Sequence, residues 1–137
     1  MKIAIYPGSF NPFHTGHNEV LEKALKVFDK VVVARGINPS KNGQILRADA
    51  DAWLGMGLDK KRFELLEFTG LLVKVVDKIN PCAIIKGLRN GIDMEYERTQ
   101  QYLNEDLGIK IPVFYIIAGR NYTHISSSAI RVIDSLK

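Results

Sequence analysis

The chain has 137 residues, of which 46% are apolar, and this length and composition predict one globular domain with an ordinary hydrophobic core. Its 19 basic and 15 acidic residues give a net charge of +4 that is spread along the chain, which disfavours nucleic acid and suits anionic small molecules. The apolar runs are too short for a signal peptide or a membrane span, so we expect a cytoplasmic protein without membrane contact.

The amino-terminal segment, residues 3–17, joins a short strand pattern to a polar loop. Ile3 to Tyr6 is a β-branched and aromatic run, which predicts a buried strand that turns at Pro7-Gly8. A helix is expected over residues 16–28, with an apolar face made of Val20, Leu21, Ala24, Leu25, Val27 and Phe28. Backbone N–H groups at such a helix start favour anions, so the histidines and glycines beside it suggest a phosphate site.

Strands and helices are then expected to alternate along the chain. The strands are predicted at residues 31–34, 62–68, 83–86 and 112–117. The helices are predicted as a short one within 47–60 that ends near Gly55, then 71–79 with Leu71 on its apolar face, 94–107 and 129–136. Gly87 and Leu88 are expected in the loop after the fourth strand. This alternation predicts an α/β fold with a parallel sheet.

The cysteine and histidine residues do not indicate a metal site or a disulfide. Cys82 is the single cysteine, and we expect it to be buried as a small apolar residue at the start of the fourth strand. His14, His17 and His124 lack the cysteine partners or second-shell pattern of a zinc site, so no protein-held metal is predicted.

Residues 14–17 read His-Thr-Gly-His, the His-x-Gly-His form found in nucleotidyltransferases that share a Rossmann-like fold with class I aminoacyl-tRNA synthetases. Further segments follow in the order and at the spacing of one family within that superfamily. They are Asn38-Pro39-Ser40-Lys41, the block from Lys86-Gly87-Leu88-Arg89 to Asn104, and Ile125-Ser126-Ser127-Ser128. On these segments the chain resembles the phosphopantetheine adenylyltransferases.

The resemblance implies one Rossmann-like, doubly wound α/β domain over residues 1–137, a five-stranded parallel sheet of order 3-2-1-4-5, and a homo-oligomer. It also implies transfer of AMP from ATP to 4′-phosphopantetheine, giving dephospho-coenzyme A and pyrophosphate, with Mg²⁺ accompanying ATP. Because the attacking group is already a phosphate anion, this chemistry needs in-line placement and cations rather than a side-chain nucleophile.

By resemblance, His17 would be catalytic by stabilising the α-phosphate in the transition state, and Lys41 by holding the incoming phosphate. The ATP site would comprise Ser9, Phe10, His14, His17, Gly87, Leu88, Arg89, Glu97, Tyr122, Thr123, His124, Ile125, Ser126, Ser127 and Ser128. The acceptor site would comprise Ser9, Lys41, Leu72 and Lys86. Plainer interpretations are Leu72 as core, Lys41 as a solvated loop residue, the serines as helix caps, and Arg89 in a salt-bridge cluster with Asp93 and Glu97.

Two features leave other functions open. His14 stands where phosphopantetheine adenylyltransferases usually carry threonine, whereas nicotinamide or nicotinate mononucleotide adenylyltransferases and cytidylyltransferases carry histidine. The sequence of residues 125–131 is likewise close to that of the nicotinamide enzymes. Residues 47–60 depart most from the family, so a catalytically idle nucleotide-binding module is a further alternative.

Overall fold

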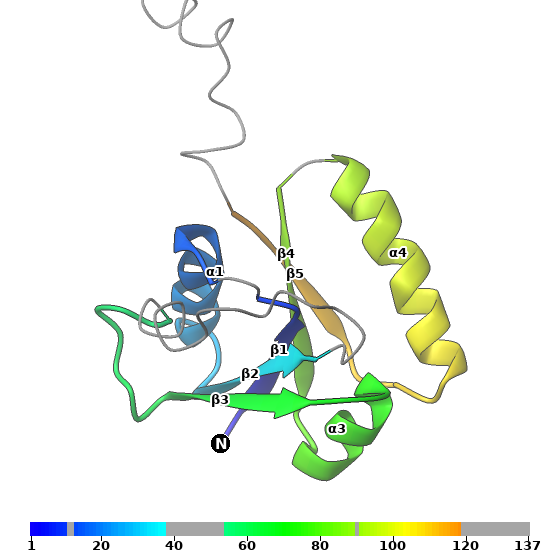
Figure 1. Ribbon diagram of the computed structural model, residues 1–137, viewed down its shortest axis with the longest axis horizontal. Coiled ribbons are helices and arrows are strands. Elements are labelled where there is room, and N and C mark those ends of the chain that lie inside the picture. Colours follow the sequence, from blue (N-terminus) through cyan, green and yellow to red (C-terminus); the bar gives the residue numbers. More distant parts are fainter. Residues whose placement is uncertain (11–12, 38–53, 90, 119–137) are drawn as a thin grey trace, which may run out of the picture.

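The computed structural model of the chain describes residues 1–10, 13–37, 54–89 and 91–118 (Figure 1). Its strands are β1 (Ile3–Gly8), β2 (Lys30–Gly36), β3 (Phe63–Phe68), β4 (Ala83–Leu88) and β5 (Val113–Ile117). Its helices are α1 (Thr15–Leu25), α3 (Leu72–Ile79) and α4 (Gly91–Asp106). None of the helices in these ranges is long and apolar enough to cross a bilayer.

The strands form one five-stranded parallel sheet of order β3-β2-β1-β4-β5, which confirms the predicted order. The central strand β1 pairs along its whole length with β2, from Ile3 opposite Lys30 to Gly8 opposite Arg35. On its other side Ala4 and Ile5 pair with Ala83 and Ile84 of β4. Helix α1 covers one face of the sheet, and α3 and α4 lie on the other (Figure 1).

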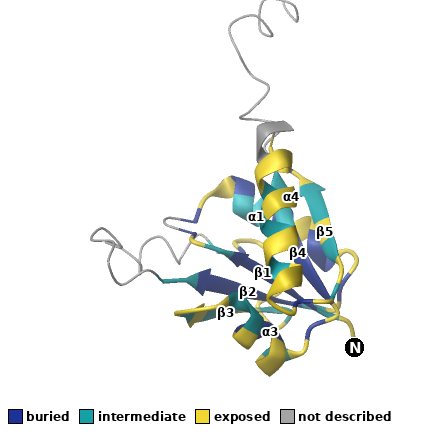
Figure 2. Cartoon of the chain, turned by 90° about the vertical axis from the view of Figure 1, so that its right-hand side faces the viewer, coloured by how far each residue is buried: buried dark blue, intermediate teal, exposed yellow. Residues whose placement is uncertain are grey.

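The central strands are buried from both faces, as their continuous apolar sequences require. Alternate residues of β1 enter opposite halves of the core: Ala4 packs toward α1, and Ile5 packs with Val75 and Val76 of α3. Figure 2 shows the buried strands enclosed between helices, with exposed residues along α4. Because every pairing in the sheet is parallel, the carboxyl ends of all five strands lie at one edge.

Two details of the helices differ from the prediction. Helix α1 ends at Leu25, and Val27, which was expected on its apolar face, is 60% exposed. The chain must turn back here to enter β2, and Phe28 alone of this turn reaches the core. Leu71 precedes α3 as its cap residue and is exposed, so its assignment to the apolar face was wrong. Asn80 ends α3 in the left-handed conformation, which asparagine adopts more readily than most residues.

The fourth strand also differs from the prediction at both ends. Gly87 and Leu88, expected in a loop, continue β4 and pair with Ile116 and Ile117 of β5. Cys82 is exposed rather than buried, because it precedes β4 at the amino edge of the sheet. Most of the short helix predicted within 47–60 lies outside the described residues, and its described end, from Leu54, is a turn. The helix predicted at 129–136 also lies outside them.

Candidate active site

A cavity of about 250 Å³ opens at the carboxyl edge of the sheet, between the start of α1, the end of β4 and α4. Its lining includes the predicted site residues Ser9, Phe10, His14, His17, Lys86, Gly87, Arg89 and Glu97. It also includes Gly8 and Gly16, the glycines that the sequence associated with a phosphate site, and Tyr6, Pro7, Val20 and Ala118, which the sequence prediction did not assign to the site. Tyr6 and Val20 were assigned to buried faces, and only their places near the predicted strand end and helix start could have indicated a site.

The two histidines cap the start of α1 reciprocally. His14 has extended backbone, and its Nδ1 accepts a hydrogen bond of 3.1 Å from the N–H of Gly16. In return, the N–H of His14 donates to Nδ1 of His17 at 3.1 Å. Serine or threonine with glutamate usually forms this capping box, and imidazoles replace both here. Because each Nδ1 accepts, the proton of each neutral ring is on Nε2.

The environment keeps both rings neutral. Burial, together with the nearby His14 and Arg89, lowers the pKa of His17 to about 3. Burial and the positive charge of Arg89 also lower the pKa of His14. A neutral His17 at the amino end of a helix presents its Nε2–H as a fixed hydrogen-bond donor, as a developing oxyanion requires.

Gly16 is required by the close approach of the His14 ring. A Cβ on Gly16 would lie 2.9 Å from Cε1 and 3.0 Å from Nδ1 of His14, inside van der Waals contact. His14 also stacks on His17, with 3.6 Å between the ring centroids and 23° between the planes. Any side chain at Gly16 would therefore displace both the cap and the stack that orients His17.

Phe10 is held in a strained backbone conformation, with its ring in contact with the ring of His17. Its φ of 42° is in the left-handed region, which costs a residue other than glycine roughly 1–2 kcal/mol. Its ring is 4% exposed and meets the His17 ring edge-on at 4.9 Å. A Cβ on Gly8 would lie 2.9 Å from the Phe10 ring, so this glycine admits the phenyl group. Burial of the ring offsets the backbone strain.

Charged groups face the cavity from β4 and α4. Nζ of Lys86 lies 3.6 Å from Oε2 of Glu97, and the two side chains are 22% and 18% exposed. Glu97 thus pairs with Lys86, whereas Asp93 of the expected salt-bridge cluster has no described side chain. Arg89 opposes protonation of both histidines and favours ionisation of Tyr6, so it contributes positive potential to the cavity. Burial nevertheless raises the pKa of Tyr6 and keeps its hydroxyl protonated.

A family model described as cytidylyltransferase-like matches residues 5–133 of the chain. The phosphopantetheine adenylyltransferase of Clostridium perfringens is 37% identical over 136 residues, which are 98% of this chain and 83% of the relative. The enzyme of that name from Geotalea daltonii is 36% identical over 137 residues, 99% of this chain and 85% of the relative. The chain belongs to the phosphopantetheine adenylyltransferase family.

Membership of this family makes the chain a nucleotidyltransferase. Solved structures show the same fold at lower sequence identity. A lipopolysaccharide core biosynthesis protein from Thermoplasma volcanium is 21% identical with a TM-score of 0.59, covering 87% of this chain and 98% of its own. A pantoate-beta-alanine ligase from Francisella tularensis is 14% identical with a TM-score of 0.60, covering 99% of this chain and 70% of its own.

Some residues that resemblance to the adenylyltransferase family assigned to the site lie elsewhere or are not described. Leu72 packs against the half of the core that contains Ile5, on the face of the sheet opposite α1. Leu88 pairs with Ile117 in the sheet and does not line the cavity. Lys41 and residues 122–128 lie outside the described residues. The structure therefore brings together the residues assigned from β1, α1, β4 and α4.

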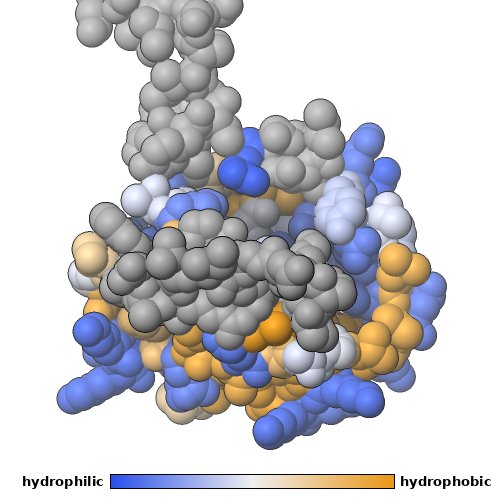
Figure 3. All heavy atoms as spheres, viewed as in Figure 1, coloured by the Kyte–Doolittle hydropathy of each residue, from blue (hydrophilic) through white to orange (hydrophobic). Residues whose placement is uncertain are grey.

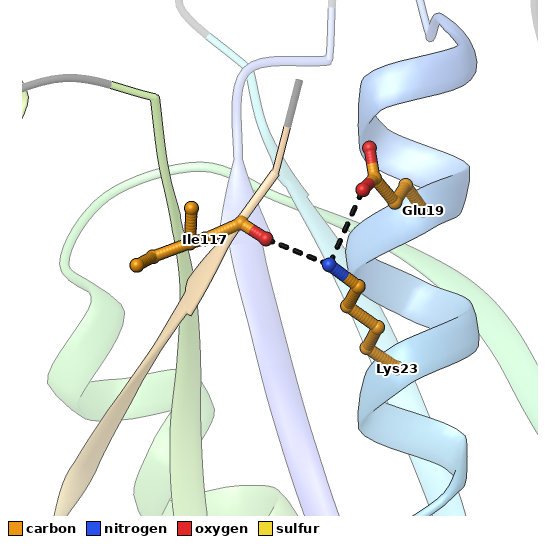
Figure 4. Close-up of polar contacts among 3 residues, drawn as sticks. All are labelled: Glu19, Lys23 and Ile117. Carbon is orange, nitrogen blue, oxygen red and sulfur yellow. Dashed lines mark hydrogen bonds and ion pairs between the residues drawn. The ribbon is translucent and has the colours of Figure 1, made fainter. Parts of the chain in front are cut away.

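Lys23 ties α1 to the end of β5. Its Nζ donates to the carbonyl oxygen of Ile117 at 2.9 Å and pairs with Oε1 of Glu19, one turn earlier, at 3.2 Å (Figure 4). Glu19 is two residues from His17 on the same helix. Ile117 is followed after four residues by the segment 122–128, which the family resemblance assigns to ATP. Lys23 thus fixes the last strand end relative to the helix that carries His17.

Proposed function

We propose that this chain transfers the adenylyl group of ATP to 4′-phosphopantetheine, forming dephospho-coenzyme A and pyrophosphate. The main support is the convergence of His14, His17, Lys86 and Arg89 on one cavity at the carboxyl edge of the sheet. Ligands of open α/β sheets bind at this edge, and helix starts there favour phosphate. The names of the curated relatives supply the acceptor.

The proposed reaction is an in-line displacement at the α-phosphorus of ATP. A phosphate oxygen of the acceptor forms the new P–O bond while the bond to the β-phosphate oxygen breaks and pyrophosphate leaves. No proton has to be removed from the attacking oxygen. The protein must therefore place two anions together and stabilise the charge that grows on the α-phosphate oxygens.

The site residues divide this task among them. Nε2–H of His17 would donate to an α-phosphate oxygen, and the low pKa of the ring keeps it a neutral donor near pH 7. Lys86 would contact the acceptor, with Glu97 holding its ammonium group in place, while Arg89 would bind the ATP phosphates. Lys41, assigned by family resemblance, would hold the incoming phosphate.

The residues of the cavity suit Mg²⁺ that arrives with ATP. Glu97 is the single carboxylate among the described lining residues, and it is already paired with Lys86. Nor do three or more His, Cys, Asp or Glu side chains group together in the ranges that the structure describes. Magnesium commonly binds through substrate phosphates and keeps several waters, so a protein cage is not required.

The test is pyrophosphate release from Mg-ATP with phosphopantetheine, with nicotinamide mononucleotide, or without an acceptor. Release with phosphopantetheine alone is the expected result. Release with the mononucleotide alone would assign the chain to the nicotinamide branch, which His14 left open. Binding of ATP without pyrophosphate release under any of these conditions would identify an idle nucleotide-binding module. Replacing ATP with CTP in the same assay tests for cytidylyl transfer.

We also propose that the protein is a cytoplasmic homo-oligomer that does not bind nucleic acid. Supporting the assembly, none of the described side chains of α4 is buried, although a helix normally buries one face. Its exposed apolar residues are Met94, Tyr96, Tyr102 and Leu103, and Leu107 directly after the helix is also exposed. Figure 3 shows apolar side chains beside hydrophilic ones on the surface viewed as in Figure 1. Light scattering of the purified protein measures the assembly, and a monomer would overturn this proposal.

A further inference from the structure

Arg35 is the one charged residue that is buried among the residues that the structure describes. It is 2% exposed and lies near the carboxyl end of β2, directly opposite Gly8 of β1. Burying a guanidinium group is unfavourable unless it makes strong compensating contacts. The position beside the cavity suggests that the group serves the site.

Arg35 contacts a carboxylate and a phenyl ring. Its Nη1 lies 3.3 Å from Oε1 of Glu67 on the neighbouring strand β3. Its Cζ lies 4.7 Å from the centroid of the Phe13 ring, within the range of a cation–π interaction. A desolvated guanidinium makes this interaction strongly, so it holds the phenyl ring from one side.

The contacts continue from Phe13 to His17. Phe13 stacks on Phe10, with 4.8 Å between centroids and 17° between planes. The His17 ring meets Phe10 edge-on at 4.9 Å and Phe13 edge-on at 6.0 Å. Phe13 and Phe10 are 3% and 4% exposed, so neither ring has room to turn away. A continuous line of packed groups therefore connects Arg35 to the imidazole of the candidate catalytic histidine.

We propose that Arg35 is a positioning residue for adenylyl transfer, acting on His17 through Phe13 and Phe10. The Glu67 carboxylate orients the guanidinium group, the guanidinium holds Phe13, and the stacked phenyl rings hold the imidazole at the angle that directs Nε2 into the cavity. This role rests on the proposed function for its kinetic consequence. The packing itself can be measured without turnover.

A second ion pair on the same two strands provides the matched control. Lys30 at the start of β2 pairs with Glu64 of β3 at 3.4 Å, and the two side chains are 30% and 55% exposed. This pair joins the same strands as Arg35 and Glu67 but lies at the opposite edge of the sheet. If an ion pair between β2 and β3 only strengthened the sheet, removing either pair would leave His17 unchanged.

The first experiment observes His17 directly by NMR of protein labelled at histidine. The chain has three histidines, and His17→Gln identifies the signal of His17 by its loss. Arg35→Leu/Glu67→Gln should shift the ring signals of His17, because the phenyl rings that surround it move. Lys30→Leu/Glu64→Gln should leave them in place. Unchanged His17 signals in a folded Arg35→Leu/Glu67→Gln protein would overturn the proposal, whatever reaction the protein catalyses.

The second experiment measures kcat for pyrophosphate release in two backgrounds. With His17 present, Arg35→Leu/Glu67→Gln should lower kcat by roughly tenfold, as expected for a misplaced catalytic group, and should leave KM for ATP within twofold. In the His17→Ala background the same change should have no further effect on kcat. An equal decrease in both backgrounds would show that Arg35 acts independently of His17 and would contradict the proposal.

Phe13→Leu tests the same line of contacts without altering the ion pair. Phe13→Leu should lower kcat by about as much as Arg35→Leu/Glu67→Gln does. Combining all three substitutions should lower kcat little further. Additive losses would contradict the proposed route through Phe13. Because this variant leaves Arg35 and Glu67 together, it keeps the proposal testable if the double substitution does not fold. Absence of turnover in the unmodified protein would reject the proposed function while the NMR measurement still tested the packing.

Discussion

The two edges of the parallel sheet use polar and charged side chains in opposite ways. At the carboxyl edge the start of α1 presents N–H groups and imidazoles, and Lys86 and Arg89 face an open cavity. At the amino edge the cation Arg62 lies beside a helix end, where it binds the protein's own carbonyl oxygens instead of facing a cavity. Its guanidinium donates to the carbonyl oxygens of Leu25, Phe28 and Asp29, at or just after the end of α1.

The difference follows from the direction of the helices. In a parallel sheet the helix starts gather at the carboxyl edge, where unpaired N–H groups carry partial positive charge. The helix ends gather at the amino edge, where unpaired carbonyl oxygens need donors. At the amino edge the guanidinium of Arg62 is therefore paired with the protein's own carbonyl groups, whereas the cations at the carboxyl edge add to a field that suits a phosphate ligand. The predictions below separate these two roles.

The largest effect is expected at the carboxyl edge, for His17→Ala. Loss of a donor to the α-phosphate should lower kcat by about 100-fold to 1,000-fold, while the affinity for ATP should change by less than about threefold. Steady-state pyrophosphate release and equilibrium ATP binding measure the two quantities. Lys30→Ala, at the amino edge, is the control and should leave both unchanged. Losses of equal size in kcat and ATP affinity would remove the transition-state role.

At the amino edge, Arg62→Ala should affect stability and leave turnover intact. Three carbonyl oxygens at the end of α1 lose a charged donor, which should cost about 2–3 kcal/mol of unfolding free energy. Urea denaturation gives this difference, with the exposed neighbour Lys61→Ala as the control of nearly unchanged stability. A fall in kcat of more than about twofold for folded Arg62→Ala would break the division between the edges.

The carboxyl edge should also dominate the acid sensitivity of the protein. The pKa of His17 is lowered from 6.5 to about 3 in the folded state. As the pH falls from 6.5 toward 3, His17 therefore binds a proton in the unfolded chain but not in the folded protein. Folding stability should therefore decrease, by about 2 kcal/mol from this residue between pH 7 and pH 5. His17→Gln should lose this part of the pH dependence in urea denaturation, whereas Arg62→Ala should retain it. A pH dependence that is unchanged in His17→Gln would contradict the neutral, half-buried state of the ring.

The smallest effect is expected for the link between α1 and β5. Lys23 is partly exposed, so Lys23→Met should lower the unfolding free energy by less than about 1 kcal/mol. It should raise KM for ATP by roughly twofold to threefold, because the segment assigned to the triphosphate follows β5. Lys26→Met removes another cation near the same helix end and should leave KM unchanged. Equal values for the two variants would show that only net charge matters.

The periodicity of the sequence predicted most elements of the sheet, and errors fell where the chain changes direction. Val31 to Ala34 is apolar without interruption and forms a strand buried from both faces. Val27 continued the helical pattern but lies in the turn after α1, because the geometry of the crossover ends the helix first. Gly87 has no apolar side chain to mark it as strand, yet pairing with Ile116 places it in β4. Cys82 was predicted to be buried because the residues on either side of it, Pro81 and Ala83, have the pattern of core residues, and both are indeed buried.

By itself, the sequence determined the parallel α/β order and placed His14, His17, Lys86 and Arg89 at one edge, because apolar periodicity and family motifs are local along the chain. The tertiary structure alone decided how these groups act on one another. The depressed pKa of His17, to which burial and Arg89 contribute, and the burial of Arg35 against Phe13 depend on which surfaces meet and how completely they exclude water. Arg35 and Phe13 are far apart in sequence, as are Arg89 and His17, and no local pattern records that they lie close together.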